Sequence, residues 1–396
     1  MAINIYQVQS PLSQVTRNHT DAYLKTVGDA LGEELKRVEL DEFEKSPFGL
    51  VFVASGGSEG IFKAGYEHFS EKPCYILTSG ESNSLAASME ILSFLQERGK
   101  RGEIIHGSVA DVARRIRALE KAYRALGRLK GMRMGTIGAP SDWLIASDTD
   151  GRAYGEKIGL TLVPVPIEEL ISEANRGGYE PNEYTEKLMA LGYDKEEMRK
   201  SFNVYGALKR IIKKYDLNAV TVRCFDLLDT VCSTGCLGLA ILNAEGIYAG
   251  CEGDIPSAVS MAILGAVSGE PVFLCNPSRI DTAAGEMILA HCTLPVNMPK
   301  SMKLMTHYES NSGVAIAGEI QTGACTIFKA DGELSRYFAK KAELVENLHE
   351  THLCRTQIKL KLDDFSYFLK HPITNHHTVC RGDHVDALEE FFNLIG

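Results

Sequence analysis

Short apolar runs alternate with longer helical stretches over most of the chain, and this alternation restricts the fold more than any other feature. Two of the stretches between the runs have helical periodicity, Ser84–Arg98 and Val109–Leu129. Strands that alternate with helices form βαβ units and therefore a parallel, doubly wound sheet. The first 130 residues contain four strand-like runs, Ile3–Val8, Gly49–Ala54, Cys74–Leu77 and Glu103–His106.

A second α/β segment begins near Met132 and includes the strand-like run Asn218–Asp226. From Ile280 onward, strand-like pieces follow one another with few helices, which predicts an antiparallel sheet or a small barrel. An amphipathic helix is expected at Val385–Leu394. We therefore predict an α/β fold with two doubly wound parallel-sheet domains, residues 1–130 and 131–279, and a β-rich, barrel-like domain, residues 280–396.

Charge and hydropathy exclude several classes of protein. The net charge of −10 argues against a nucleic-acid surface, because phosphate binding needs a basic field. No run of 18 apolar residues is present and the N-terminus does not have the pattern of a signal peptide, so neither a membrane span nor secretion is expected. Several of the ten cysteines lie in apolar runs, which favours buried, reduced thiols and a cytoplasmic protein.

The stretch around Glu252 carries the clearest signal for chemistry. A strand ends at Glu252, Pro256 opens a helix, and Gly269 ends that helix before the next strand, which leads to Asn276. The crossover in such a β-α-β unit makes the two strands parallel. Glu252 and Asn276 are therefore expected at the carboxyl edge of one sheet.

Other strand ends add polar groups to the same region. The additional candidates are Asp226, Asp254, Asp281 and His291. Oxygen donors with one or two imidazoles suit Mn²⁺, Mg²⁺ or Co²⁺ better than a structural zinc ion. Near the C-terminus, His376 and His377 are adjacent, and neighbouring strand residues point to opposite faces. Only one of the two histidines can easily face the acidic strand ends.

Residues Val222 to Val379 resemble the L-fucose/L-arabinose isomerase-like family. The A-G-C-E-G-D segment with the S-A-V-S-M helix after it is similar to the family's metal-glutamate motif, which assigns that role to Glu252. The L-A-H-C segment resembles the family's mid-domain histidine, here His291, and N-H-H-T-V resembles the late metal histidine, here His377. The three-part organisation is also similar.

The resemblance implies a metal-dependent aldose–ketose isomerase that works through a cis-enediolate, with Mn²⁺ as the first choice of metal. It assigns Glu252 as ligand and proton-transfer base, His377 as ligand and Asn276 as a weaker ligand, and it places His291 near the metal or the substrate oxygens. It also implies a homo-oligomer, a trimer or hexamer, with active sites at subunit interfaces.

Asn276 departs from the family, which usually has a carboxylate at this position. An amide oxygen can bind a metal, but it cannot act as a base. The second acid/base role then falls to Asp226, Asp254, Asp281 or His291. The departure also leaves open an anionic sugar such as sulfoquinovose as substrate. The basic residues that could bind its anionic group are Arg223, Arg279, Arg355 and Arg381.

Several residues are candidates for substrate binding. They are Arg223, Asp254, Trp143, Ser82, Asn83 and His376. Trp143 could stack on a sugar face or belong to the core, and Ser82 could bind hydroxyls or cap a helix. Arg223 could instead pair with Asp254.

Two other classes of function remain open. One is a non-catalytic sugar-binding or regulatory protein, because α/β domains joined by a hinge often serve that role. The other is a metal-dependent lyase or aldolase that shares the enediolate intermediate.

Overall fold

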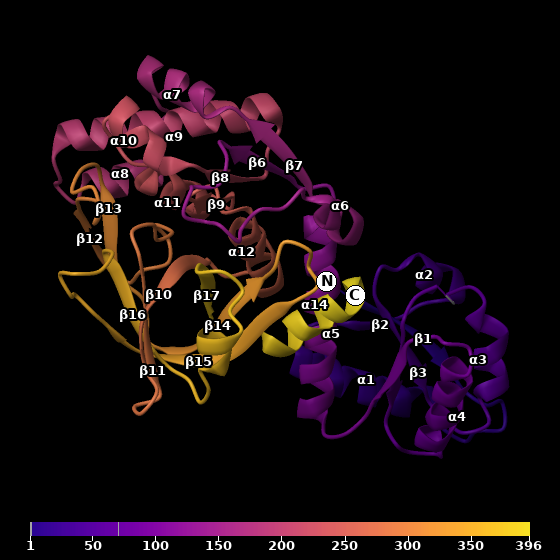
Figure 1. Ribbon diagram of the computed structural model, residues 1–396. Coiled ribbons are helices and arrows are strands. Elements are labelled where there is room, and N and C mark those ends of the chain that lie inside the picture. Colours follow the sequence, from indigo (N-terminus) through magenta and orange to yellow (C-terminus); the bar gives the residue numbers. More distant parts are fainter. Residues whose placement is uncertain (1, 70) are drawn as a thin grey trace. The chain divides into compact units, whose positions relative to one another are not determined.

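The computed structural model describes residues 2–69 and 71–396 and forms two compact units, Met1–Tyr123 and Arg124–Gly396 (Figure 1). The division falls within α5 (Val109–Leu129). The domain boundaries predicted at 130/131 and 279/280 stay predictions, and the second of them falls inside a strand. None of the helices in the described part of the chain has the length and apolarity needed to cross a bilayer.

The first unit contains a five-stranded parallel sheet in the order β2-β1-β3-β4-β5. Apolar residues fill both faces of this sheet, as expected of buried parallel strands. Ile5 and Phe52 pack on the face covered by α1 and α5, and Val51 and Ile76 pack on the face covered by α3 and α4. The elements are β1 (Ile3–Val8), α1 (Arg17–Leu31), β2 (Leu35–Arg37), α2 (Leu40–Lys45), β3 (Gly49–Val53), α3 (Glu59–Tyr66), β4 (Cys74–Thr78), α4 (Ser84–Gln96) and β5 (Gly102–Ile105). The predicted doubly wound sheet is confirmed.

The second unit begins with a four-stranded parallel sheet in the order β7-β6-β8-β9. Its strands are β6 (Arg133–Ile137), β7 (Thr161–Val165), β8 (Ala219–Val222) and β9 (Tyr248–Cys251). Its helices are α6 (Arg152–Ile158), α7 (Ile167–Arg176), α8 (Glu183–Met189), α9 (Lys195–Tyr215), the 3₁₀ turn η1 (Cys224–Asp226), α10 (Leu227–Thr230), α11 (Cys236–Ala244) and α12 (Ile255–Ser268).

A closed antiparallel barrel follows in the same unit, with strands in the order β10-β11-β16-β15-β14-β17. The predicted barrel-like C-terminal region is therefore confirmed. The remaining elements are β10 (Phe273–Asp281), β11 (Glu286–His291), β12 (Ser301–Met305), β13 (Ala315–Glu319), β14 (Gly323–Ala330), β15 (Tyr337–Asn347), β16 (Thr356–Lys361), α13 (Ser366–Lys370), β17 (His377–Arg381) and α14 (Val385–Ile395). Strands β12 and β13 form a separate antiparallel pair.

The strand that carries Asn276 corrects one prediction. β9 and β10 were expected to lie parallel in one sheet, but β10 belongs to the barrel, where it pairs antiparallel with β11 and β17. The helix between them therefore links the sheet to the barrel instead of returning to the sheet. A short turn joins β10 to β11, and Asp281 accepts hydrogen bonds from the backbone N–H groups of Ala283 and Ala284 in that turn. This local hairpin takes the place of the longer-range parallel pairing.

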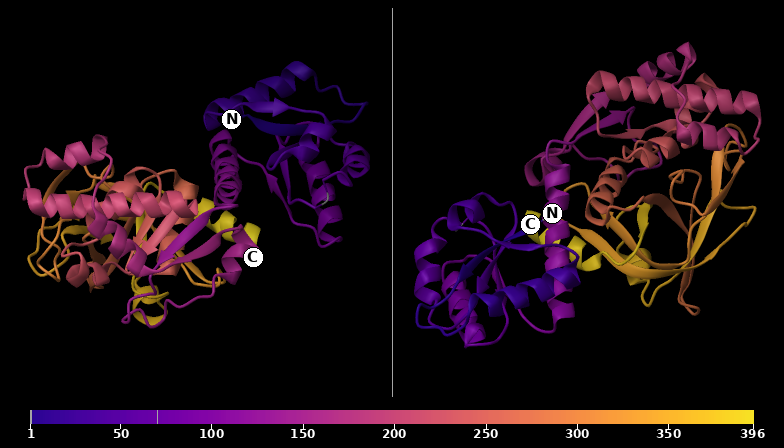
Figure 2. Two further views of the ribbon diagram at one scale, coloured as in Figure 1. Left: turned by 90° about the horizontal axis from the view of Figure 1, so that it is seen from above. Right: turned by 180° about the vertical axis from the view of Figure 1, so that it is seen from behind.

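Helix α12 lies between the parallel sheet and the barrel and contacts β9, β14 and β17 (Figure 2). It is buried on nearly every side, which explains its almost wholly apolar composition. Its ends match the expected signals: the Asp254 side chain accepts from the backbone N–H of Ser257, Pro256 lies in the first turn, and Gly269 ends the helix in the left-handed region. The helix thereby fixes Asp254 and the preceding Glu252 beside the barrel.

Candidate metal centre

Glu252 lies in a tight turn between β9 and α12. Its backbone has a φ of 63°, and Gly253 follows with a φ of 70°. A side chain at Gly253 would place its Cβ 2.5 Å from the carbonyl oxygen of Ala139, so only glycine allows the two segments to approach this closely. The backbone N–H of Ser141 donates to the carbonyl oxygen of Glu252 at 2.9 Å. The loop after β6 therefore holds the turn in place.

Glu252, His291 and His376 form a cluster whose potential ligand atoms all lie within 4.8 Å of one another. Oε1 of Glu252 lies 3.4 Å from Nε2 of His376 and 3.9 Å from Nε2 of His291. The three residues are 9, 0 and 6% exposed in the order Glu252, His376, His291, so water competes little with any ligand they bind. Among the described residues, no other group of three His, Cys, Asp or Glu side chains has this arrangement.

His376 is oriented by a buried carboxylate. Its Nδ1 lies 2.9 Å from Oδ2 of Asp254, so Nδ1 carries a proton and donates it to this oxygen. The other ring nitrogen, Nε2, has no hydrogen-bond partner in the described part of the chain although it is buried. A histidine that donates from one nitrogen to a carboxylate and presents the other to a cluster has the arrangement typical of metal ligands.

Asp254 lies in its own network of buried polar groups. The Ser257 hydroxyl donates to Oδ2 at 2.7 Å, and Lys329 Nζ lies 4.0 Å from Oδ1 and donates to the Ser257 hydroxyl at 2.5 Å. Asp254 and Lys329 are both fully buried. The lysine charge therefore compensates the aspartate, since an unpaired buried charge costs several kcal/mol.

The charges of the cluster shift its pKa values in opposite directions. Burial would raise the pKa of Glu252, but the approach of His376 Nε2 to 3.4 Å, the charges of both histidines and the Trp143 hydrogen bond lower it to about 2. Burial would lower the pKa of His376, but hydrogen bonding to Asp254 and the charges of Asp254 and Glu252 raise it to about 9. For His291 burial dominates and lowers the pKa to about 3. Without a metal, the cluster at neutral pH thus holds a carboxylate, an imidazolium and a neutral imidazole.

The neutral His291 ring has a defined tautomer. The backbone N–H of Thr293 donates to Nδ1 of His291 at 3.3 Å, so the ring proton lies on Nε2, the atom that faces Glu252. Binding a metal through Nε2 would require the proton to move to Nδ1. His376 needs no such change, because its proton is already held by Asp254.

Trp143 lies beside the cluster and is half-exposed, so it does not belong to the core. Its indole N–H donates to Oε2 of Glu252 at 2.6 Å, while the side chain stays 52% exposed. The ring packs edge-on against Phe225 at a centroid distance of 4.8 Å. The side chain therefore fixes one carboxylate oxygen and presents an aromatic surface beside it.

Arg223 and Asp226 hold the neighbouring loop. The Arg223 guanidinium donates to Asp226 at 3.1 Å, to Asp142 at 3.1 Å and to the carbonyl oxygen of Pro140 at 2.6 Å. It pairs with these groups and not with Asp254. Because Pro140 and Asp142 lie directly before Trp143 in the chain, Arg223 positions the Trp143 loop.

The structure does not bring His377 to the cluster. Its Nε2 lies 2.9 Å from the hydroxyl of Tyr367, and its Nδ1 lies 2.9 Å from the carbonyl oxygen of Asn375. Of the two adjacent histidines, His376 is the one beside Glu252. Asn276 is half-buried in β10, and its side-chain oxygen accepts from the Asn375 amide at 3.3 Å.

Ser82 and Asn83 lie in the first unit, before α4. Both have positive φ values, 51° and 57°. Asn83, and not Ser82, occupies the N-cap position, and its side chain makes no capping hydrogen bond. The helix-cap interpretation of Ser82 is therefore wrong, and the role of both residues in substrate binding stays a prediction.

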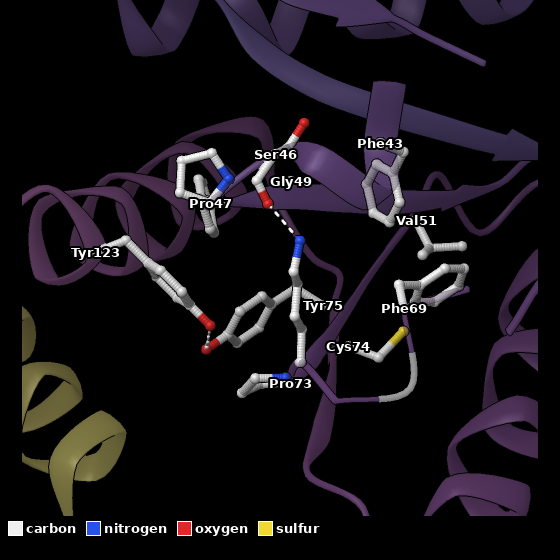
Figure 3. Close-up of a pocket in the computed structure, with 12 residues that line it drawn as sticks. Phe43, Ser46, Pro47, Gly49, Val51, Phe69, Pro73, Cys74, Tyr75 and Tyr123 are labelled. Carbon is white, nitrogen blue, oxygen red and sulfur yellow. Dashed lines mark hydrogen bonds between the residues drawn. The ribbon is translucent and has the colours of Figure 1, made fainter. Parts of the chain in front are cut away.

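A pocket in the first unit lies at the N-terminal ends of β3 and β4 and is distinct from the cluster (Figure 3). Its walls are mostly apolar, and the hydroxyls of Tyr75 and Tyr123 approach to 3.4 Å across it. Lys72 donates to the carbonyl oxygen of Ser46 at 2.7 Å. The pocket lining contains no carboxylate or imidazole.

Sequence reasoning missed Lys329 and His307. Lys329 interrupts an apolar strand, and a lysine in such a run is a signal of a buried charge. His307 packs edge-on against Phe225 at 5.6 Å and lies within electrostatic range of Glu252. Its signal in the sequence is weak, because it precedes an ordinary polar turn.

A parallel sheet, a closed barrel and a buried Glu/His/His cluster between them define a protein with a candidate metal centre.

No protein-family model matches the chain. It is similar to a sulfoquinovose isomerase of Alkalicoccus urumqiensis, 23% identical over 190 residues, which are 46% of this chain and 43% of that protein. It is also similar to a sulfoquinovose isomerase of Clostridium sp. (strain MSTE9), 26% identical over 196 residues, which are 46% of this chain and 42% of that protein. The similarity thus spans less than half the length of each curated relative.

Proposed function

We propose that this chain is an aldose–ketose isomerase that acts on an anionic sugar of the sulfoquinovose type and requires a divalent metal, with Mn²⁺ preferred and Mg²⁺ or Co²⁺ as alternatives. The observation that carries the proposal is the buried cluster of Glu252, His291 and His376. The two sulfoquinovose isomerases similar to the chain support an isomerase and favour an anionic substrate over a neutral aldose.

The donor atoms of the cluster fit a divalent metal. Nε2 of His376 is buried without a hydrogen-bond partner and faces a carboxylate oxygen at 3.4 Å, which is a place for a cation. In the metal-free chain the imidazolium proton supplies this positive charge, and a metal would replace that proton. Glu252 and His376 would be the principal ligands. A carboxylate with imidazole nitrogen suits Mn²⁺ and related ions. The hydrogen bond to Asp254 would raise the basicity of the histidine ligand.

When bound, the metal would stabilise the negative charge that develops on the two sugar oxygens of the enediolate. Glu252 is assigned the transfer of the proton between the two carbons. Its Oε2 is fixed by Trp143, so Oε1 is the oxygen directed at the cluster. Proton removal next to a carbonyl depends on such positioning of the base.

Among the four candidates for the second group, His291 is the best placed to act on the substrate oxygens. The three aspartates are already engaged in other contacts. Asp254 contacts His376, Ser257 and Lys329. Asp226 pairs with Arg223, and Asp281 accepts hydrogen bonds in the β10–β11 turn. His291 is neutral and carries its proton on Nε2, toward Glu252. From Nε2 it can donate a hydrogen bond to a substrate oxygen and so stabilise the charge that develops there. The rival role, a third metal ligand, needs the other tautomer.

The assembly is proposed to be a homo-oligomer, a trimer or hexamer. Trp143 is half-exposed beside the cluster, and Ile145, two residues further, is 92% exposed. Apolar side chains in this position are typical of surfaces that another subunit covers.

Proton exchange tests the proposal directly. The full chain is incubated in D₂O with Mn²⁺ and sulfoquinovose, and deuterium at C2 and ketose formation are followed by NMR. We expect both with the wild type and a loss of at least about 100-fold with Glu252→Gln, since the amide cannot accept the proton. Glu319→Gln, at a half-exposed carboxylate outside the cluster, serves as the matched control.

Three other outcomes would replace the proposal. Cleavage of a carbon–carbon bond would identify a lyase or aldolase. Binding of the sugar without exchange would identify a sugar-binding protein. Absence of exchange with sulfoquinovose and with neutral aldoses, in the presence of each of the three metals, would exclude an isomerase.

A further inference from the structure

Arg355 lies at the same end of the barrel as the candidate metal centre. It directly precedes Thr356, the first residue of β16, and Thr356 is paired with His291 at the end of β11. The Thr356 hydroxyl donates to the carbonyl oxygen of Ile316 and accepts from the N–H of Gly318. Pairing and hydrogen bonds therefore fix the backbone next to Arg355 relative to His291.

The Arg355 guanidinium is held by neutral groups. Nε donates to the carbonyl oxygen of Thr306 at 2.7 Å, and Nη2 donates to the Thr306 hydroxyl at 3.1 Å. The guanidinium carbon lies 5.5 Å from the centre of the Tyr308 ring. Nη1 makes no hydrogen bond within the described residues, and no carboxylate there lies within 4.0 Å, although Glu309 is in the same loop.

The other three arginines that were candidates for binding an anion are either paired with carboxylates or exposed. Arg223 is paired with Asp226 and Asp142. Arg279 makes two hydrogen bonds to Glu350 on the surface. Arg381 is exposed at the end of β17. Arg355 alone among these four is half-buried and without a carboxylate partner.

A row of aromatic rings connects this region with Glu252. Trp143 donates to Glu252 and contacts Phe225, and Phe225 contacts His307, which precedes Tyr308. The positive charge of Arg355 and the negative charge of Glu252 both act on His307. Arg355 therefore lies on the side of the cluster where the exposed face of Trp143 could receive a sugar.

We propose that Arg355 binds the anionic group of the sugar substrate, a sulfonate or another oxyanion, while the opposite end of the sugar reaches Glu252. This inference rests on the proposed function and names the residue that selects its substrate class. A half-buried cation without a counter-ion is costly, and an anionic ligand supplies the missing charge. Thr306 holds the guanidinium in place before binding, which reduces the entropy lost when the ligand binds.

Ligand binding tests the role of Arg355 separately from catalysis. Calorimetry with the full chain and Mn²⁺ compares sulfoquinovose with glucose, its neutral counterpart, and with glucose 6-phosphate and glucuronate. We expect Arg355→Gln to weaken binding of sulfoquinovose roughly 10- to 100-fold and to leave glucose unchanged, as for the loss of a hydrogen bond to a charged group. The phosphate and carboxylate sugars show whether the site distinguishes among oxyanions.

Three further variants separate recognition from structure. Arg355→Lys keeps the charge and is expected to retain part of the preference. Thr306→Val removes one hydrogen bond to the guanidinium and is expected to have a smaller effect than Arg355→Gln. Arg279→Gln, at a surface ion pair, is the matched control and should bind like the wild type.

The inference is overturned if the wild type binds sulfoquinovose no more tightly than glucose, or if Arg355→Gln weakens both sugars equally. Equal weakening would mean that Arg355 only supports the Thr306 loop. If the wild type prefers sulfoquinovose through Arg355 but does not isomerise it, the binding role stands and the proposed function fails.

Discussion

Nδ1 of His376 donates to Oδ2 of Asp254 over 2.9 Å, and both side chains are fully buried. The two residues come from distant parts of the chain, one before β17 and one at the start of α12. The contact fixes the tautomer of His376 and turns its Nε2 toward Glu252. The geometry around this pair and Glu252 leads to five predictions.

Asp254→Asn is expected to weaken Mn²⁺ binding 10- to 100-fold. The amide keeps the shape of the side chain but loses the charge that orients His376 and compensates Lys329, and loss of such a partner has this effect in metal sites. Calorimetric titration with Mn²⁺ measures the change. Asp281→Asn, in the exposed β10–β11 turn, is the matched control and should bind Mn²⁺ like the wild type. Equal affinities for all three proteins would contradict the prediction.

The two adjacent histidines should respond differently to substitution. His376→Ala removes a principal ligand and should abolish stoichiometric Mn²⁺ binding. His377→Ala should retain binding but lower the free energy of unfolding by about 1–3 kcal/mol, because the half-buried Tyr367 hydroxyl loses the imidazole to which it donates. Metal titration and urea denaturation of both variants test this pair. The reverse pattern, with binding lost only in His377→Ala, would restore the assignment made from the family resemblance.

Mn²⁺ affinity should increase about tenfold for each unit by which the pH rises, up to pH 9. The raised pKa of His376, about 9, means that metal binding at lower pH must displace one proton. Glu252 and His291 have pKa values of about 2 and 3 and are already deprotonated, so they add nothing to this slope. Titrations at pH 6, 7 and 8 provide the measurement. If the affinity is the same at all three pH values, the metal does not displace a proton from His376.

The same shift predicts how the metal-free chain responds to pH. Since the pKa of His376 is raised from 6.5 to about 9 on folding, its contribution to stability is fully present below pH 6.5 and is lost as the pH rises through 9. His376→Gln should remove this dependence from urea denaturation curves.

Trp143→Phe should reduce turnover roughly tenfold or more without unfolding the chain. The variant loses the hydrogen bond to Glu252 but keeps an aromatic ring against Phe225. A hydrogen bond to a charged group contributes about 1.5–3 kcal/mol. Because Trp143 is the single tryptophan of the chain, its fluorescence in the wild type should also decrease when paramagnetic Mn²⁺ binds. Unchanged fluorescence on saturation with Mn²⁺ would place the metal elsewhere.

Local signals in the sequence identified much of what surrounds Glu252. The strand before it, the turn and the whole of α12 follow from the cap at Asp254, Pro256 in the first turn and Gly269 at the end. These signals depend on residues a few positions apart, which is why they can be recognised without the fold. The succession of short strands after β10 likewise predicted the barrel.

The sequence by itself determined the order of strands and helices, the ends of α12 and the polar residues available for a site. Tertiary structure alone decided that β10 joins the barrel and that His376, not His377, faces Glu252. Both outcomes depend on pairing between distant strands: Cys275 pairs with His377, and a shift of this pairing by one residue would exchange the faces of the two histidines. The pairing depends on competition among strands that are far apart in the chain, and local sequence patterns cannot predict its result.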